Sequence, residues 1–589
     1  MNLAVRYPGE REPGMTLVQE RPVASGEMSP IETEKRRVRG LLTESHLVVL
    51  IAGVSYATVA GFLDFRYQVF PPDAVFRMAN GFYVLYSRHF HLAAIGFVWN
   101  PLTSVADMVP LLLKDLWHPL VSRDIAASTM TVVAMVGAVH QLRAMIREWG
   151  VARTPRLVLT ALFALNPMVI YYAANGMSEA LYLFTTIGTA RYLRRWFAED
   201  DLRSLVFAGA MLAFCYLARE EGVAIAAVSG LLVLGVSVYR ATGPRRLMTA
   251  LTDLAVYLLP VFTAFVGWAF ASLVITGSAF DQFTSQYGNT AQIQDYGSYY
   301  HLLPGHYLQR LTHELSGLES MAPLLPLVIV VAAVVAVRRR DGQMLVPVSI
   351  FGGGIGFTLL SYLDNQIFPW FRFYILAVPL EVLLVAAILA PGELVVERQH
   401  SGDATPSAAR STRTLGVVVS LAGACLALLL IGPSIITTAR AMNNKNIGIE
   451  ESAQLSAVFH PSTYRKLPSD SDLLPIMPYL ENLNLPDADV VTDNAYDCMA
   501  TTIMRSSNPK IFVITNDSDF QKILADPLTW HVHYLVVPPP GGIFDAIISA
   551  YPTLYKSGAG FAKLVRQFPV TSICPALRLY KVTGHTSTP

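Results

Sequence analysis

Residues 46–63, HLVVLIAGVSYATVAGFL, form a nearly uninterrupted apolar run, and QVFPPDAVFRMANG follows at residues 68–81. Apolar runs of about 18 residues or more with few charges are typical of membrane-spanning helices. The second stretch brings two prolines and then a single carboxylate, Asp73. The two stretches together predict a membrane span that ends beside an acidic residue at the membrane–water boundary.

The apolar pattern recurs along the whole chain of 589 residues. Hydrophobic residues make up 53% and charged residues 15% of the sequence, whereas soluble proteins average about 25% charged residues. The net charge of +1 provides no basic field, which argues against a nucleic-acid partner. We therefore expect a polytopic α-helical membrane protein that contacts membrane lipids.

Eleven stretches are apolar and long enough to be spans, and the positive-inside rule gives their orientation. They cover about 46–66, 124–142, 155–173, 178–195, 203–218, 221–239, 250–275, 319–337, 344–362, 371–391 and 414–437. With the N-terminus inside, every inside loop carries arginines, from Arg143 in the first loop to Arg413 in the last. Residues 100–120 contain charges and prolines and suit a helix at the membrane interface instead. The C-terminus is then outside.

This orientation divides the chain into three parts. Residues 1–43 are polar and contain prolines, which predicts a disordered cytoplasmic tail. Residues 44–440 form the transmembrane domain, with long outer loops at 67–123 and 276–318. Residues 441–589 alternate strand-like and helix-like segments, which predicts an extracytoplasmic α/β domain with a mostly parallel sheet.

Several features of the C-terminal region bear on its function. The expected strands lie at 488–493, 510–516, 532–538 and 576–582. Asp493 and Asn494 end the first of them, where α/β domains often bind ligands, although both residue types are also common in turns. Cys498 and Cys574 would lie in an oxidising compartment, where a disulfide between them can form. No glycine-rich phosphate loop follows a strand, so nucleotide binding has little support.

Polar residues gather at the expected outer ends of the spans. Asp73 can act as a general base or bind a divalent metal, and it also suits a helix N-cap. The other candidates are Arg77 on the first outer loop, Asn175 and Glu179 on the hairpin NPMVIYYAANGMSEALYLF, Arg219 and Glu220 on the turn AREEG, and Arg372 and Tyr374 on RFYILAVP. Helix capping is the alternative for Glu179, and snorkelling is the alternative for Arg372. Together they predict one outer-face cavity for a lipid-linked phosphate, because arginine binds phosphate oxygens bidentately.

The order of these motifs resembles the GT-C superfamily of membrane glycosyltransferases, in the branch of protein mannosyltransferases and lipid A aminoarabinose transferases. The resemblance covers about residues 44–440 and rests on PPDAVFRMANG, the NP…NGMSE hairpin, AREEG and RFYILAVP. It implies transfer of a sugar, with inversion, from a polyprenyl-phosphate donor to an extracytoplasmic glycan, lipid or protein acceptor. It also implies a multi-pass protein of the plasma membrane, in a bacterium the inner membrane.

The resemblance implies roles for single residues as well. Asp73 matches the catalytic carboxylate, which would deprotonate the acceptor hydroxyl or hold a divalent cation, Mg²⁺ or Mn²⁺. Relatives often carry paired acids in this loop, and here Pro72 precedes Asp73, which leaves the metal open. Arg219 and Arg372 would hold the phosphate leaving group. The alternatives are a transporter of lipid-linked glycans and a non-catalytic envelope-assembly scaffold, and loss of function in Asp73→Asn would argue against both.

Overall fold

The computed structural model describes residues 30–296, 305–391, 406–463, 470–541 and 544–586. The chain divides into two compact units, Met1–Val48 and Val49–Pro589. The first helix, α1 (Pro30–Gly61), begins within the tail expected over residues 1–43. The rest of that tail lies outside the described residues. Residues 31–43 are helical because they contain no proline and are rich in helix formers.

The chain is mostly helical, with about seven candidate membrane spans. Among the residues with assigned structure, seven helices are long and apolar enough to cross a membrane, or eight if one bent pair counts as a span. Four of the seven are complete helices: α5 (Ile125–Glu148), α10 (Gly222–Arg240), α11 (Arg246–Thr276) and α16 (Leu345–Leu363). The other three are Glu44–Tyr67, which overlaps the end of α1; Phe371–Leu389, which includes α17 (Ala377–Leu389); and Gly416–Met442, which is part of α19 (Pro406–Met442). The bent pair, α14 (Tyr307–Met321) and α15 (Leu325–Arg339), meets at 71°.

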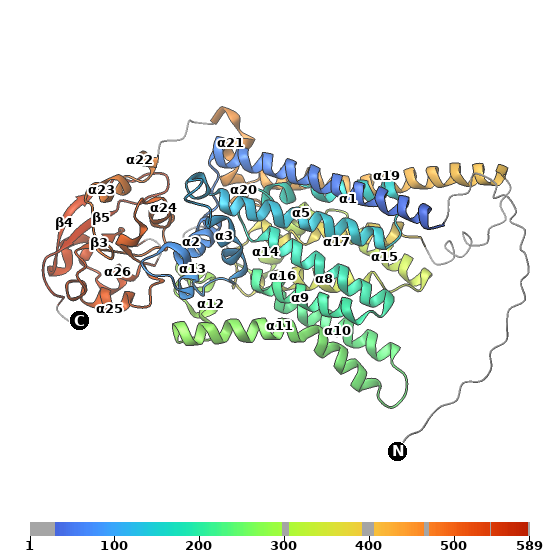
Figure 1. The fold of residues 1–589 in the computed structure, drawn as a ribbon, viewed down its shortest axis with the longest axis horizontal. Coiled ribbons are helices and arrows are strands. Elements are labelled where there is room, and N and C mark those ends of the chain that lie inside the picture. The colour runs from blue at the N-terminus through green and yellow to red at the C-terminus, as the bar shows by residue number, and fades with distance from the viewer. Residues whose placement is uncertain (1–29, 297–304, 392–405, 464–469, 542–543, 587–589) are drawn as a thin grey trace, which may run out of the picture. The chain divides into compact units, whose positions relative to one another are not determined.

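The eleven expected spans all fall on helices, and four of them are shorter, broken or more charged than the seven above. The stretch 155–173 is divided at Asn166 into α6 (Arg153–Ala164) and α7 (Pro167–Tyr172). α8 (Glu179–Glu199) carries three arginines near its end, and α9 (Leu202–Ala218) has 17 residues. The fourth stretch lies on α15, of 15 residues. The count of eleven and the orientation remain predictions. Figure 1 shows α5, α8 and α9 side by side, and α8 packs against both of the others.

The two loops expected on the outer side, 67–123 and 276–318, are named the first and second outer loops, and they contain short helices that flank the site. They are α2 (Pro72–Tyr86), α3 (Leu102–Leu111) and α4 (Pro119–Ser122) in the first loop, and α12 (Asp281–Thr284) and α13 (Asn289–Tyr296) in the second. α3 and the residues after it expose apolar side chains such as Val109, Leu112 and Leu116. These exposed side chains fit a helix that lies at the membrane interface. Gly81 allows α2 and α3 to approach closely, since a Cβ there would lie 2.7 Å from the Ser104 carbonyl oxygen.

The C-terminal region contains a small five-stranded sheet with the order β2-β1-β3-β5-β4. The strands are β1 (Val490–Thr492), β2 (Phe512–Val513), β3 (Tyr534–Val537), β4 (Ala562–Gln567) and β5 (Arg578–Val582). β1 pairs in parallel with β2 and β3, whereas β5 pairs antiparallel with β3 and β4. Four strands coincide with the expected segments. The sequence pattern misses β4 because AKLVRQ mixes apolar and charged residues without a continuous apolar run and forms an exposed edge strand.

Short helices surround this sheet. They are α20 (Ile449–Gln454), α21 (Ser456–Phe459), α22 (Asp470–Leu473), α23 (Ile476–Asn482), α24 (Asp497–Arg505), α25 (Phe520–Ala525), α26 (Ala546–Ala550) and α27 (Leu554–Ser557). Cys498 and Cys574 form a disulfide with their Cα atoms 4.9 Å apart, which links α24 to the segment before β5.

The C-terminal region shares a hydrophobic core with the first outer loop. α24 packs against α2, and Met78 and Phe82 of α2 lie in one buried cluster with Met499 and Ile503 of α24. Charged contacts extend this interface, because Arg88 donates hydrogen bonds to Asp517 at 2.9 Å and to Asp519 at 2.5 Å. The helix that begins beside Asp73 is therefore fixed along its length by the C-terminal region.

Both outer loops are held at the carboxyl ends of the parallel strands. The Asn516 side chain, just after β2, donates a hydrogen bond to the Ala94 carbonyl at 2.7 Å. The Tyr287 hydroxyl, between α12 and α13, donates to Asp493 just after β1 at 2.8 Å. Asp493 and Asn494 lie where α/β domains often bind ligands. In this protein both are buried, and their side chains bond to Tyr287 and Asn516.

Candidate active site

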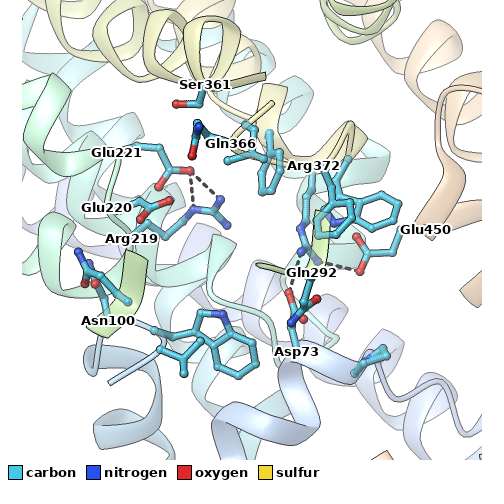
Figure 2. A pocket seen from close by; sticks show the side chains of 18 of the residues that line it. Asp73, Asn100, Arg219, Glu220, Glu221, Gln292, Ser361, Gln366, Arg372 and Glu450 are labelled. Atoms are coloured by element: carbon cyan, nitrogen blue, oxygen red, sulfur yellow. Dashed lines mark hydrogen bonds and ion pairs between the residues drawn. The ribbon is translucent and has the colours of Figure 1, made fainter. Parts of the chain in front are cut away.

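A cavity of about 670 Å³ lies where the outer loops, three helix ends and the start of the C-terminal region meet. Its charged lining residues are Asp73, Arg77, Arg219, Glu220, Glu221, Arg372 and Glu450. Trp99, Phe283, Phe368 and Trp370 add aromatic surface. Figure 2 shows Asp73, Arg372 and Glu450 grouped together, with Arg219, Glu220 and Glu221 on another part of the wall. Segments far apart in the sequence therefore converge on one polar hollow.

Asp73 reaches the cavity from the first turn of α2. Pro71 is the N-cap residue and Pro72 occupies the first helical position, which its fixed φ suits. Asp73 is therefore not the N-cap, contrary to the capping alternative, and its side chain remains available to the cavity. A carboxylate in a first helical turn is also favoured by the helix dipole.

Arg372 is the centre of one ion-pair network. Its Nη2 donates to Asp73 Oδ2 at 2.7 Å and its Nη1 donates to Glu450 Oε1 at 2.7 Å. Its Nε lies 3.5 Å from Glu179 Oε1. The side chain is 6% exposed, so it does not snorkel to water. Arg372 thereby connects the first outer loop to α20.

Arg219 is the centre of a second network on the turn between α9 and α10. Its Nη1 donates to Glu179 Oε1 at 2.6 Å, and its Nε and Nη2 donate to Glu221 Oε1 at 2.9 and 2.6 Å. Ser178 makes no side-chain cap bond and Glu179 is fully buried, so the main contact of Glu179 is with arginine and not with a helix terminus. Glu179 links the two networks.

Arg77 and Glu220 differ from the paired groups. The Arg77 guanidinium lies over the Trp99 ring at 4.9 Å, and its Nε and Nη1 are buried without a hydrogen-bond partner among the described residues. Within the same part of the chain, the Glu220 side chain makes no hydrogen bond or ion pair. Both residues line the cavity. The site therefore contains one cation and one carboxyl group that the surrounding protein does not pair.

The pKa values of the site carboxyls diverge. Burial acts to raise the pKa of Asp73, but Arg372 and Arg77 outweigh it and the net pKa is lowered. Burial, reinforced by Glu221, raises the pKa of Glu220 to about 7. Burial also raises the pKa of Glu450 to about 8, against the attraction of Arg372. Asp73 is thus ionised at neutral pH, whereas Glu220 and Glu450 titrate near it.

These shifts predict that stability falls as the pH rises. The folded-state pKa values of Glu220 and Glu450 exceed the ordinary value of 4.5, so the folded protein holds protons more tightly than the unfolded chain. Their contribution is present below pH 4.5 and is lost as the pH rises to about 8. The lowered pKa of Asp73 changes the stability only below pH 3.8, so it does not alter the trend expected at higher pH.

The measurement is the melting temperature of the detergent-solubilised protein between about pH 5 and about pH 9. We expect the double variant Glu220→Gln, Glu450→Gln to have a flatter profile than the wild type. Glu199→Gln, which alters an exposed carboxyl at the end of α8, should retain the wild-type slope. Equal slopes in the double variant and the wild type would contradict this assignment.

The structure brings together most of the expected site residues but not all of them. Asp73, Arg77, Arg219, Glu220 and Arg372 line the cavity. Glu179 lies behind it and contacts both arginine networks.

Asn175 and Tyr374 do not belong to the cavity wall, which corrects their expected placement. The Asn175 side chain accepts a hydrogen bond from the Met177 backbone, as a residue of a tight turn commonly does. Tyr374 lies on a short 3₁₀ turn that directs its hydroxyl to Glu314 of α14.

Sequence reasoning misses Glu450 and its neighbour Glu451. Glu450 pairs with Arg372, and Glu451 accepts a hydrogen bond from the Tyr172 hydroxyl at 2.7 Å. The available signal was the adjacent acid pair in GIEES, shortly after the last span on the expected outer side. Most of the polar C-terminal region shares that composition, so the signal is weak.

The residues present do not fit the divalent cation that the resemblance implied. No three His, Cys, Asp or Glu side chains among the described residues lie where they could hold a metal ion. Asp73 Oδ2 accepts a hydrogen bond from Arg372, and Glu450 and Glu221 are engaged with arginines. No step below uses a metal.

Solved structures that are similar to this chain include three of the oligosaccharyltransferase of Archaeoglobus fulgidus. The form tethered with an acceptor peptide has a TM-score of 0.41 and 12% identity, covering 90% of this chain and 74% of that chain. The complex with an inhibitory peptide and a dolichol-phosphate has a TM-score of 0.42 and 11% identity, covering 84% and 69%. The complex with Zn and sulfate has a TM-score of 0.39 and 11% identity, covering 90% and 73%. No family model and no curated protein matches the chain.

Proposed function

We propose that the protein is a membrane glycosyltransferase that moves a sugar from a polyprenyl-phosphate donor to an extracytoplasmic glycan, lipid or protein acceptor. The observation that carries this proposal is the convergence of Asp73, Glu220 and three arginines on one cavity beside apolar helices. A polar hollow with unpaired charge is costly unless a ligand or reaction uses it. The proposed location is a plasma membrane, in a bacterium the inner membrane, with residues 441–589 outside.

Asp73 is the proposed proton acceptor. Its carboxylate is ionised at neutral pH and reaches the cavity, where an acceptor hydroxyl can approach it. The acceptor oxygen forms a bond to the anomeric carbon of the donor sugar while the bond from that carbon to the phosphate oxygen breaks. The hydroxyl proton passes to Asp73, and the polyprenyl phosphate leaves as the anion. One displacement of this kind inverts the configuration at the anomeric carbon.

Arg372 and Arg219 organise the acids of the site in this proposal. Arg372 holds Asp73 with a charge-assisted hydrogen bond of 2.7 Å and so fixes the direction of its carboxylate. Arg219 holds Glu179 and Glu221 in the neighbouring network. If either guanidinium contacts the donor phosphate, as the resemblance implies, it must first give up a carboxylate. Preorganised charge of this kind stabilises a transition state in which charge develops.

The test is release of polyprenyl phosphate by the purified protein in lipid nanodiscs. Polyprenyl-phosphate hexoses and pentoses are supplied in turn, with and without a cell-envelope extract as the acceptor source. We expect one donor class to release polyprenyl phosphate in an acceptor-dependent manner. Absence of release with every donor, in folded protein, would favour the scaffold alternative. In proteoliposomes, movement of the intact donor across the bilayer without release would favour the transporter.

A further inference from the structure

The three guanidinium groups of the cavity are not equivalent. Arg219 donates from all three of its nitrogens to carboxylates of Glu179 and Glu221. Arg372 donates from both terminal nitrogens to Asp73 and Glu450. Arg77 makes no ion pair with any described residue, and its Nε and Nη1 are buried without a hydrogen-bond partner there. Among the described residues, Arg77 is therefore the arginine of the cavity wall that has no carboxylate partner.

The surroundings of Arg77 favour an anion. Its residue is 8% exposed, so the unused donors are removed from bulk water, which is costly for a charged group. The Trp99 ring at 4.9 Å supports one face of the guanidinium and holds its orientation beside the cavity. Arg77 lies one helical turn after Asp73 on α2, so both side chains project from the same face of that helix.

Asp107, a buried acid whose charge would interact with Arg77, does not replace this anion. Asp107 of α3 is fully buried, and both of its carboxyl oxygens lack hydrogen-bond partners in the described structure. Burial raises the pKa of Asp107 well above its usual range, which disfavours the negative charge that would balance Arg77 at this position. Burial likewise lowers the pKa of Arg77, a cost that a bound anion would remove.

We propose that Arg77, whose guanidinium lines the cavity without a carboxylate partner, binds the phosphate group of the lipid ligand. This inference rests on the proposed function, since it names the group that holds the leaving phosphate there. The arginines then have separate roles: Arg372 and Arg219 hold the carboxylates of the site, and Arg77 binds the ligand. Placement on α2 keeps the phosphate close to the helix that carries Asp73.

The experiment measures thermal unfolding of the full chain in detergent with polyprenyl phosphate, polyprenol or inorganic phosphate added. A ligand that binds only the folded state raises the melting temperature in proportion to its affinity. The variants are Arg77→Gln, Arg77→Lys and Arg123→Gln. Arg123→Gln removes the same charge from the same outer loop at a residue that does not line the cavity.

We expect polyprenyl phosphate to raise the melting temperature of the wild type, of Arg123→Gln and of Asp73→Asn. We expect Arg77→Gln to weaken binding roughly tenfold or more, the loss typical of charge-assisted hydrogen bonds, and Arg77→Lys to retain part of the shift. Polyprenol should have no effect, and inorganic phosphate should act weakly because it lacks the prenyl contacts. If Arg77→Gln does not fold, a reduced shift in folded Arg77→Lys supports the inference and an undiminished shift overturns it.

Three further outcomes separate the inference from the function on which it rests. Equal shifts in the wild type and Arg77→Gln would overturn the role of Arg77 and leave the polyprenyl-phosphate donor class standing. No shift in folded wild type at saturating lipid would overturn the donor class and this inference with it. A response to inorganic phosphate without a response to polyprenyl phosphate would overturn the lipid as the source of the phosphate.

Discussion

Asp73→Asn is expected to reduce kcat for sugar transfer by roughly 10²–10⁴-fold, the contribution typical of a general base. Asparagine has nearly the shape of aspartate but cannot accept a proton at neutral pH. Polyprenyl phosphate should still bind, because the proposed phosphate ligand Arg77 is unchanged. The measurement is the rate of polyprenyl phosphate release in nanodiscs at saturating donor, together with the melting temperature of each variant.

The matched control for this variant is Asp115→Asn on the same outer loop. Asp115 pairs with Lys114 and its side chain is 80% exposed, so it makes the same charge change outside the cavity. We expect its rate to stay within about twofold of the wild type, as surface substitutions seldom change stability by much. A wild-type rate in folded Asp73→Asn would remove Asp73 from the reaction.

Arg372→Gln is expected to lower the free energy of unfolding by roughly 3–5 kcal/mol, the cost of removing one partner from a buried ion pair. Glutamine leaves Asp73 and Glu450 without the hydrogen bonds of 2.7 Å that they accept from the guanidinium. It also removes the charge beside Glu179. The loss should increase as the pH rises, because the carboxyls then ionise without a cation. Denaturant-induced unfolding in mixed micelles measures it.

Two comparisons test the cause of that loss. Arg372→Lys should restore part of the stability, since it keeps the charge but lacks a planar fork that reaches two carboxylates. Arg338→Gln, at an exposed residue in the last turn of α15, should be within about 0.5 kcal/mol of the wild type. If Arg372→Gln is as stable as Arg338→Gln, the arginine does not hold the site together.

The helices and most strands could be predicted from the sequence because their signals are local. An apolar run such as residues 46–63 has few alternatives to a span, and buried strands such as β1 and β3 are short apolar runs between turns. β4 was not predictable in this way, because an edge strand with five exposed residues of six does not need a continuous apolar run. α8 forms a helix although it carries more charge than the apolar runs by which spans are recognised, because helix formation itself does not require a low charge.

The site was predictable in part of its membership and not in its pairing. Hydropathy and loop charge predict a shared outer-face position for Asp73, Arg219 and Arg372, whereas Glu450 was missed and Asn175 and Tyr374 lie outside the cavity lining. Which carboxylate each arginine contacts depends on the packing of α2 against the C-terminal region and on the position of α20, which no local pattern contains. The sequence therefore suggested Arg219 and Arg372 as the phosphate ligands, while the structure engages both with carboxylates and leaves Arg77 with unused donors.

Photo-crosslinking with a polyprenyl phosphate that carries a photoreactive group beside the phosphate tests the central claim most directly. Peptide mass spectrometry identifies the labelled segments. The account predicts adducts on peptides that line the cavity, such as 72–77, 218–221 and 449–454, which unlabelled polyprenyl phosphate competes away. Adducts spread over lipid-facing helices such as α11, with the same pattern for a photoreactive polyprenol, would contradict a phosphate site in this cavity.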